Sequence, residues 1–90
     1  MKDILGKAVE EWGVNVNLWV FVEEVGELVK EIAKAVRYEP NYNKIIEEVA
    51  DVEIALELLK IIFKLDQEHI ERIKKDKIER LKERLEAVES

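Results

Sequence analysis

Apolar residues recur along the chain at intervals of three and four, which is the spacing of one face of an α-helix. Residues that commonly begin or end helices separate four such segments. No segment shows the two-residue alternation that is typical of a strand. The expected helices run from about Asp3 as a cap to Trp12 with Gly13 as the stop, from after Asn15 or Asn17 to about Arg37, from a cap at Asn41 or Asn43 to about Lys64, and from a cap at Asp66 nearly to the C-terminus.

These four segments predict an all-α fold. The 90 residues are enough for one domain, 1–90, and we expect a protomer that resembles a four-helix bundle. Apolar residues make up 48% of the chain, which is more than a small monomer can readily bury. We therefore expect copies of the chain to associate through helix faces.

The third helix has a second apolar line that bears on this association. The central helices carry long apolar stripes, and the third segment carries a second apolar line beside its first. A helix that is apolar on two sides is either central in a large core or shared between subunits, and in 90 residues we favour a shared one. The stripe of the second helix is Leu18, Val22, Val25, Val29, Ile32 and Val36, and the second line of the third helix is Ile46, Ala50, Ile54, Leu58 and Ile61.

Charge narrows the classes of partner. Charged residues are 40% of the chain, the net charge is −6, and cysteine is absent. This balance disfavours a broad nucleic-acid surface, and no apolar run approaches the length that spans a bilayer. We expect a cytoplasmic protein without a membrane partner. A phosphate ligand would need a metal ion to bring it to so acidic a chain.

The third segment has carboxylates where its core face should be. Successive side chains of a helix advance by about 100°, and Glu48 falls inside the apolar arc centred on Val52. Asp51 lies at the edge of the same arc. Surface carboxylates normally lie on the opposite side of such a helix, so these two are candidates for chemistry.

The second segment repeats this arrangement. Glu24, Glu27 and Glu31 are spaced so that they share one side of the helix, next to its apolar stripe. Glu31 could instead pair with Lys34 and is a second-rank candidate. If the two helices pack antiparallel, the pairs at 24 and 27 and at 48 and 51 converge. Crowded carboxylates require protonation or a cation, and oxygen ligands favour Mg²⁺, with Mn²⁺ as the alternative.

The final segment carries basic residues within its apolar stripe. Lys74 and Lys77 fall inside the stripe centred on Leu81, and Arg80 and Arg84 lie beside Lys77. Such side chains could reach phosphate oxygens. Equally, they could extend to solvent or pair with acids of a neighbouring helix.

Taken together, these motifs resemble those of one enzyme family. The segments EEVGE at 23–27 and EEVAD at 47–51 resemble the EExxE…ExxD signature of the MazG-like all-α nucleotide pyrophosphohydrolases. The upstream WGVNVNL, with Asn17, and the closing KKDKIERLKERL, with Lys77 and Arg80, resemble segments of small phage-type members. The resemblance covers nearly the whole chain.

The resemblance implies a Mg²⁺-dependent hydrolase that cleaves a (d)NTP to a (d)NMP and pyrophosphate, usually to cleanse the nucleotide pool. It also implies homodimers or homotetramers. On this hypothesis a water attacks the α-phosphorus and Glu24 is the candidate base. The expected metal ligands are Glu24, Glu27, Glu48 and Asp51, the expected phosphate contacts are Lys77 and Arg80 with Lys74 and Arg84 nearby, and the expected nucleoside contacts are Asn17 and Phe21.

Two alternatives remain open at this point. Phosphoribosyl-ATP pyrophosphohydrolase has the same fold, but typically follows the acidic aspartate with a Leu-x-Tyr-His type segment, where this chain has VEIALELL. The other alternative is a non-catalytic helical scaffold or regulator that binds partners through an apolar helix face. The scaffold predicts no stabilisation by Mg²⁺, which a melting series would test.

Overall fold

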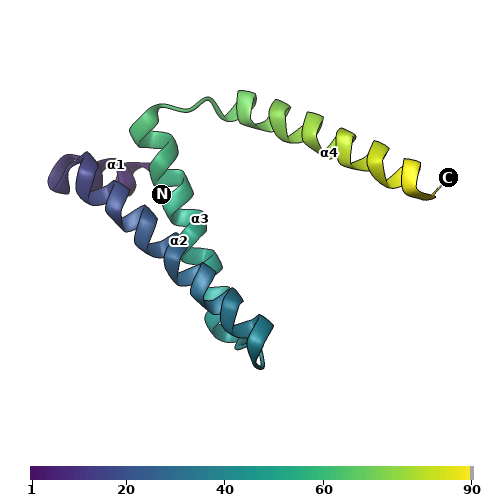
Figure 1. The fold of residues 1–90 in the computed structure, drawn as a ribbon. Coiled ribbons are helices and arrows are strands. Elements are labelled where there is room, and N and C mark those ends of the chain that lie inside the picture. Colours follow the sequence, from purple (N-terminus) through teal and green to yellow (C-terminus); the bar gives the residue numbers. More distant parts are fainter. Residues whose placement is uncertain (90) are drawn as a thin grey trace.

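Within residues 1–89 the regular structure is entirely helical. The computed structural model describes residues 1–89, which form α1 (Lys2–Trp12), α2 (Val14–Arg37), α3 (Tyr42–Phe63) and α4 (Gln67–Glu89) (Figure 1). The all-α prediction is therefore confirmed, and all four expected segments are helices. No helix within 1–89 has both the length and the apolar character needed to cross a membrane.

Helix starts differ from prediction at the N-terminal end of the chain. The first helix begins at Lys2 without a side-chain cap, so Asp3 lies in its first turn and is not the cap. The second begins directly after Gly13, so the predicted starts after Asn15 or Asn17 are wrong. Gly13 has a φ of 88°, a backbone conformation that residues with a Cβ rarely adopt. This one glycine reverses the chain, and no further linking residue is needed.

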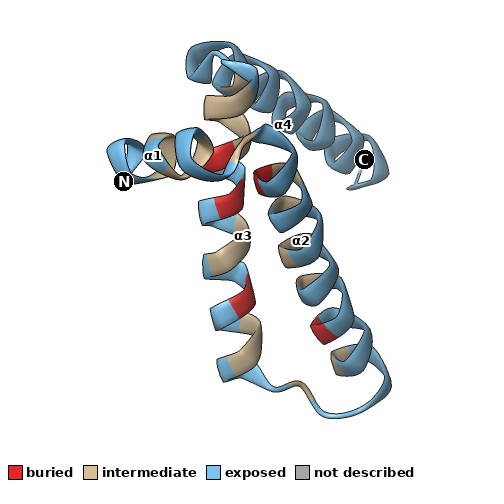
Figure 2. Ribbon diagram, turned by 90° about the vertical axis from the view of Figure 1, so that its left-hand side faces the viewer, coloured by how far each residue is buried: buried red, intermediate tan, exposed pale blue. Residues whose placement is uncertain are grey.

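The later capping predictions are confirmed. Asn41 caps α3, since its Oδ1 accepts a hydrogen bond from the backbone N–H of Lys44 at 3.1 Å. Asp66 precedes α4, and its Oδ1 accepts from the backbone N–H of Glu68 at 3.0 Å. The short connection after Arg37 leaves α2 and α3 side by side and antiparallel, as expected from its length (Figure 2).

The core is small and lies where three helices meet. The antiparallel pair α2 and α3 forms the body, and α1 packs across the end of the pair that is distant from the α2–α3 connection (Figure 2). Only Ala55 and Leu58, both on α3, are buried apolar residues within 1–89. Much of the apolar surface is therefore exposed in the single chain.

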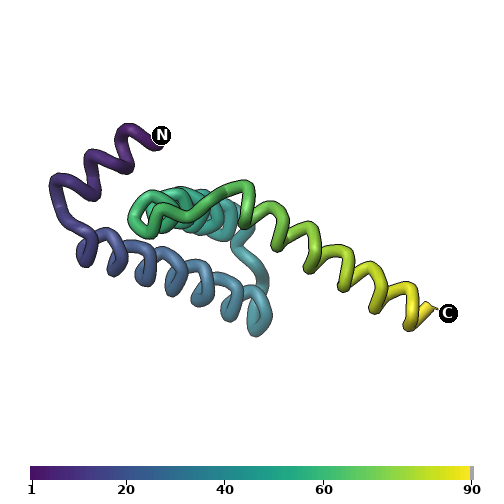
Figure 3. The backbone as a smooth tube through the Cα atoms, turned by 90° about the horizontal axis from the view of Figure 1, so that it is seen from above, coloured from purple at the N-terminus to yellow at the C-terminus, as the bar shows by residue number. Residues whose placement is uncertain are grey.

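The fourth helix does not join the other three. Within 1–89, α4 packs against none of α1 to α3 and extends away from them (Figures 1 and 3). The Cα radius of gyration is 16.9 Å, against about 12 Å for a compact chain of this length. The expected four-helix bundle is therefore wrong for the single chain, which is a three-helix body with a projecting arm. The apolar stripe of the arm, including Leu81 and Leu85, is exposed.

The second helix turns the side that carries Glu24 and Glu31 toward α3. Its buried and half-buried line combines apolar and acidic positions, whereas most of the predicted apolar stripe faces solvent. Val22, Val29 and Val36 of that stripe are all exposed. The line that faces α3 includes Asn17, Phe21, Glu24, Leu28, Glu31 and Ala35.

Candidate metal centre

Three carboxylates from two helices meet between α2 and α3. Glu24 of α2 lies against Glu48 and Asp51 of α3, and one oxygen from each falls within 4.8 Å of the others. Glu48 is 4% exposed, and the other two residues are half-buried. The predicted convergence of acidic residues from the two helices is thus seen for these three.

The helices bring these side chains together through their spacing. Glu48 and Asp51 are three residues apart, so they point from successive turns toward the same neighbour. Because α2 runs antiparallel to α3 and turns its Glu24 side inward, Glu24 faces both of them. Glu27 is exposed and lies outside the group, since it is rotated away from the line that contacts α3.

The electrostatics of the group follow from crowding and burial. Burial is the main cause that raises the pKa of Glu24 above its ordinary value, and the charges of Asp51 and Glu48 raise it further. A hydrogen bond with Asp51 acts in the same direction. The metal-free fold therefore disfavours the ionised form of Glu24, and a nearby cation would relieve that cost.

Glu48 is only half satisfied. Its Oε1 lies 3.1 Å from Nζ of Lys44, one turn earlier on α3. Its Oε2 is buried without a hydrogen-bond partner among the described residues. Leaving a buried acceptor unpaired costs on the order of 1–3 kcal/mol, and more when it is charged. A cation bound beside this oxygen would satisfy it.

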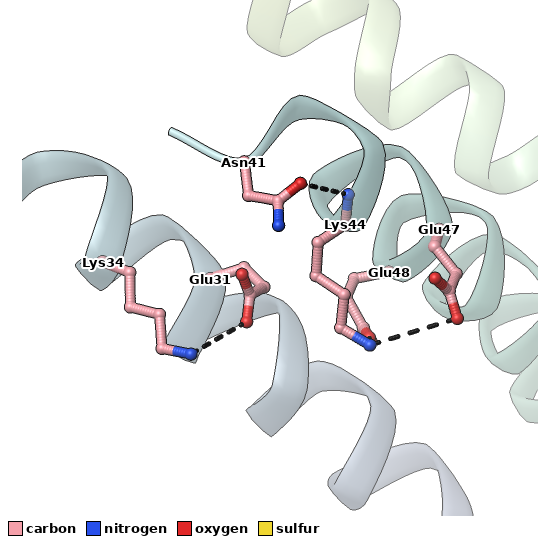
Figure 4. A network of polar contacts seen from close by, with 6 residues as sticks. All are labelled: Glu31, Lys34, Asn41, Lys44, Glu47 and Glu48. Carbon is pink, nitrogen blue, oxygen red and sulfur yellow. Dashed lines mark hydrogen bonds and ion pairs between the residues drawn. The ribbon is translucent and has the colours of Figure 1, made fainter. Parts of the chain in front are cut away.

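Two lysines form ion pairs with acidic residues near the α2–α3 connection. Lys44 Nζ also lies 4.0 Å from Oε1 of Glu47, and Lys34 Nζ lies 3.5 Å from Oε2 of the buried Glu31 (Figure 4). Hydrogen bonding to Glu48 is the main cause that raises the pKa of Lys44, with help from the charges of Glu47 and Glu48 and, more weakly, of Glu31. The alternative reading of Glu31, as the partner of Lys34, is therefore confirmed.

The ion pair of Lys44 with Glu48 is not among the contacts predicted from the sequence. Its spacing of four residues before Glu48 is a signal that could have found it, because such pairs meet on a helix surface. The sequence does not disclose, however, that the carboxylate of this pair is buried. That follows only from the packing of α3 against α2.

An apolar hollow of about 250 Å³ opens beside the carboxylates. Glu24 and Asp51 form part of its wall, and the rest is contributed by all three packed helices. The hollow is therefore a mainly apolar space with an acidic side, suited to a ligand with one flat or apolar part and one cation-bound part. The wall comprises Leu5, Ala8, Trp12, Val16, Asn17, Val20, Glu24, Asp51, Ile54, Ala55 and Leu58.

Asn17 forms part of the wall of the hollow and also makes two hydrogen bonds to the backbone. Its Nδ2 donates to the backbone oxygen of Gly13 at 2.7 Å and to that of Ala8 at 3.2 Å. These bonds tie the end of α1 to the start of α2, so both amide hydrogens have protein partners. Phe21 lies one turn farther along α2, half-buried on the side facing α3, and is not part of the wall.

The predicted phosphate contacts lie elsewhere. Lys74, Lys77, Arg80 and Arg84 are all exposed on α4. Lys74 Nζ lies 3.5 Å from Oε1 of Glu71 on the same helix. Since α4 does not pack on α2 or α3, the single chain does not bring these cations to the carboxylates.

Comparison of the chain with protein-family models, with curated proteins and with solved structures finds no match. The functional argument therefore rests on the chemistry of the residues described above.

Proposed function

We propose that this protein is a Mg²⁺-dependent nucleoside triphosphate pyrophosphohydrolase, as the motif resemblance implies. The observation that carries the proposal is the buried, unpartnered Oε2 of Glu48 within a group of three converging carboxylates. A buried acidic group with an unsatisfied oxygen is costly unless a cation completes it.

The donor set suits the proposed ion. Glu24, Glu48 and Asp51 would hold Mg²⁺, and Mn²⁺ would be accepted by the same oxygens. One oxygen from each carboxylate lies within 4.8 Å of the others, so small side-chain adjustments would bring all three to a single ion. Glu27, at the exposed edge of α2, remains a predicted ligand that would require a movement toward the group.

In the proposed reaction a water oxygen forms a bond to the α-phosphorus, and the bond from that phosphorus to the pyrophosphate oxygen breaks. A bound Mg²⁺ would supply charge neutralisation for the phosphate oxygens. Glu24 is the candidate to accept the proton of the water, because it borders the hollow. The apolar wall of the hollow would receive the nucleoside and exclude bulk water.

Holding the outer phosphates would require α4 from another copy of the chain. In the single chain α4 does not contact α2 or α3, so its basic residues do not reach the carboxylates. These residues are Lys77 and Arg80, with Lys74 and Arg84 nearby. A homodimer or homotetramer could supply them across an interface, which agrees with the exposed stripe of α4. The predicted assembly and the predicted phosphate contacts thus support one another.

Pyrophosphate release from a panel of NTPs and dNTPs, with Mg²⁺ and with EDTA, tests the function. Glu48→Gln should abolish metal-dependent release, because it removes the buried charge that binds the ion. Glu53→Gln, an exposed carboxylate on the same helix, is the matched control and should retain it. The nucleoside monophosphate should appear in equal amount. Equal activity in the two variants would overturn the assignment.

The exposed apolar surface also favours a second reading, in which the chain is a non-catalytic scaffold. A folded protein that releases no pyrophosphate across the panel and whose melting ignores Mg²⁺ would support it. Phosphoribosyl-ATP belongs in the same panel, since its hydrolysis would point to the related histidine-pathway activity.

A further inference from the structure

Lys44 is held in place through both its backbone and its side chain (Figure 4). Its backbone N–H donates to Oδ1 of Asn41, the cap of α3, at 3.1 Å, so the residue belongs to the first turn of that helix. Its Nζ lies 3.1 Å from Oε1 of Glu48, one turn later. A positive charge is therefore fixed at the edge of the carboxylate group that Glu24, Glu48 and Asp51 form.

This lysine is the one basic side chain within residues 1–89 that forms an ion pair with a member of the carboxylate group. Lys34 pairs with Glu31 instead, and Lys60 pairs with Glu57. Each of these two pairs has no net charge, so it adds little to the electrostatic potential at the three carboxylates.

The exposed Glu47 does not cancel the charge of Lys44. Its Oε1 lies 4.0 Å from Nζ, against 3.1 Å for Oε1 of Glu48, and its side chain is 66% exposed. Water and salt screen an exposed carboxylate, whereas the side chain of Glu48 is only 5% exposed. The lysine charge therefore acts mainly on Glu48 and on the group to which it belongs.

The charge of the site follows from these neighbours. When the three carboxylates are all ionised, their negative charges and the one positive charge of Lys44 leave a net charge of −2. One divalent cation is equal and opposite to this charge. Without the lysine, the same cation would leave a negative charge uncancelled at a group that includes the buried, unpaired Oε2 of Glu48. An uncompensated charge is costly where water is excluded.

We propose that Lys44 sets the charge of the carboxylate group, so that a single divalent ion neutralises it and the loaded site does not repel a polyanion. The lysine then has two opposed effects. It weakens the binding of any cation to the group, because like charges repel. It strengthens the binding of a triphosphate to the loaded group, because it removes a residual negative charge. The second effect rests on the proposed function, and the first does not.

Binding of Mn²⁺ tests the first effect, with the free ion measured by electron paramagnetic resonance at constant pH and ionic strength. Wild type should bind one ion per chain. Lys44→Gln removes the charge but keeps a hydrogen-bond donor, and the lysine side chain is 40% exposed, so circular dichroism should show an unaltered fold. This variant should bind Mn²⁺ about tenfold more tightly. La³⁺, measured by displacement of Mn²⁺, should gain about thirtyfold, because the Coulomb energy is proportional to the charge of the ion.

Two further variants separate charge from structure. Lys44→Arg keeps the charge and should retain both affinities of wild type. Lys60→Gln removes the same charge from a matched ion pair, with Nζ 3.1 Å from Oε1 of Glu57 and more than two turns beyond Asp51 on α3, and should also retain both. If Lys44 only held Glu48 in place, Lys44→Gln would bind both ions more weakly than wild type.

The pyrophosphate assay at saturating Mg²⁺ tests the second effect. Lys44→Gln should raise the KM for the triphosphate although it binds the metal more tightly, and a KM that does not rise would contradict this effect. The charge role is overturned by a wild type that binds no Mn²⁺ or two ions per chain, by Mn²⁺ binding that Lys44→Gln does not tighten, or by a gain for La³⁺ no larger than that for Mn²⁺. Tighter Mn²⁺ binding by a variant of a protein that releases no pyrophosphate would uphold the effect on the cation and reject the proposed function.

Discussion

Lys44 and Glu48 lie one turn apart on α3, with Nζ 3.1 Å from Oε1, and the ion pair leaves Oε2 of the same carboxylate buried and unpaired. The lysine therefore neutralises part of the acidic group without satisfying all of its oxygens. Four residues before a glutamate is an ordinary position for such a partner on a helix surface. What distinguishes this pair is that α2 covers the carboxylate, while Lys44 stays half-buried at the edge.

The first prediction concerns metal-dependent stability. Mg²⁺ at about 100 times its Kd should stabilise the fold by about 2.7 kcal/mol, which corresponds to roughly 10–20 °C in Tm for a domain of this size. Glu48→Gln should remove this shift. Differential scanning calorimetry at constant ionic strength, with NaCl replacing MgCl₂ in the control, provides the measurement. A shift of the same size in the variant would show that the ion binds elsewhere.

The second prediction concerns pH. Because the fold raises the pKa of Glu24 above 4.5, its neutral form contributes stability that is complete below that pH and is lost as pH rises through the folded pKa. Glu24→Gln stays neutral at every pH. In EDTA, its Tm should match wild type near pH 4 and exceed it increasingly toward neutral pH. A difference that does not change with pH would contradict the stated cause.

A third prediction separates two roles for Asn17. Because its amide bridges α1 and α2, Asn17→Ala should lower the free energy of unfolding by about 1–3 kcal/mol in urea denaturation. Asn15→Ala, at an exposed position two residues earlier, should change it little. If stability is unaltered and only the KM for the nucleotide rises, the residue acts on the ligand and not on the fold.

The cations of α4 give the fourth prediction. Lys77→Ala combined with Arg80→Ala should raise the KM for a triphosphate at least about tenfold, since two charge-assisted contacts are lost. The Mg²⁺-dependent rise in Tm should persist, because the carboxylates are untouched. Lys75→Ala with Lys82→Ala removes the same charge from another side of the helix and is the control. Equal increases in KM from both pairs would show that the effect comes from the net charge of α4 and not from contacts of Lys77 and Arg80 with phosphate.

The sequence predicted most reliably those features that depend on the residues of a single helix. The burial of Glu48 follows from the apolar residues on its own helix, and the caps at Asn41 and Asp66 follow from local chemistry. The start of α2 was missed because a single glycine completes the reversal that two asparagines had been expected to mark.

Relations between helices were harder to foresee. The predicted apolar stripe of α2 mostly faces solvent, and the side that contacts α3 carries Glu24 and Glu31. Periodicity identifies a face but does not say whether it meets its own chain or another. For the same reason the stripe of α4 suggested a fourth member of a bundle, whereas the arm stands alone in the single chain.

The isolation of α4 has a consequence for how the protein folds. Its 23 residues add no long-range contacts to the body, so the folding nucleus must lie in α1 to α3, whose contacts form between neighbouring helices. Most of the stability of a helix in a protein comes from packing of its apolar face, which α4 lacks in the single chain. The arm would therefore fray in newly made chains until, in the proposed assembly, another copy covers it. Folding would then proceed in two stages, a fast one independent of concentration and a slower one set by encounter between chains. Between the two stages the arm would be the segment most open to proteases, and dilution would lengthen that exposure.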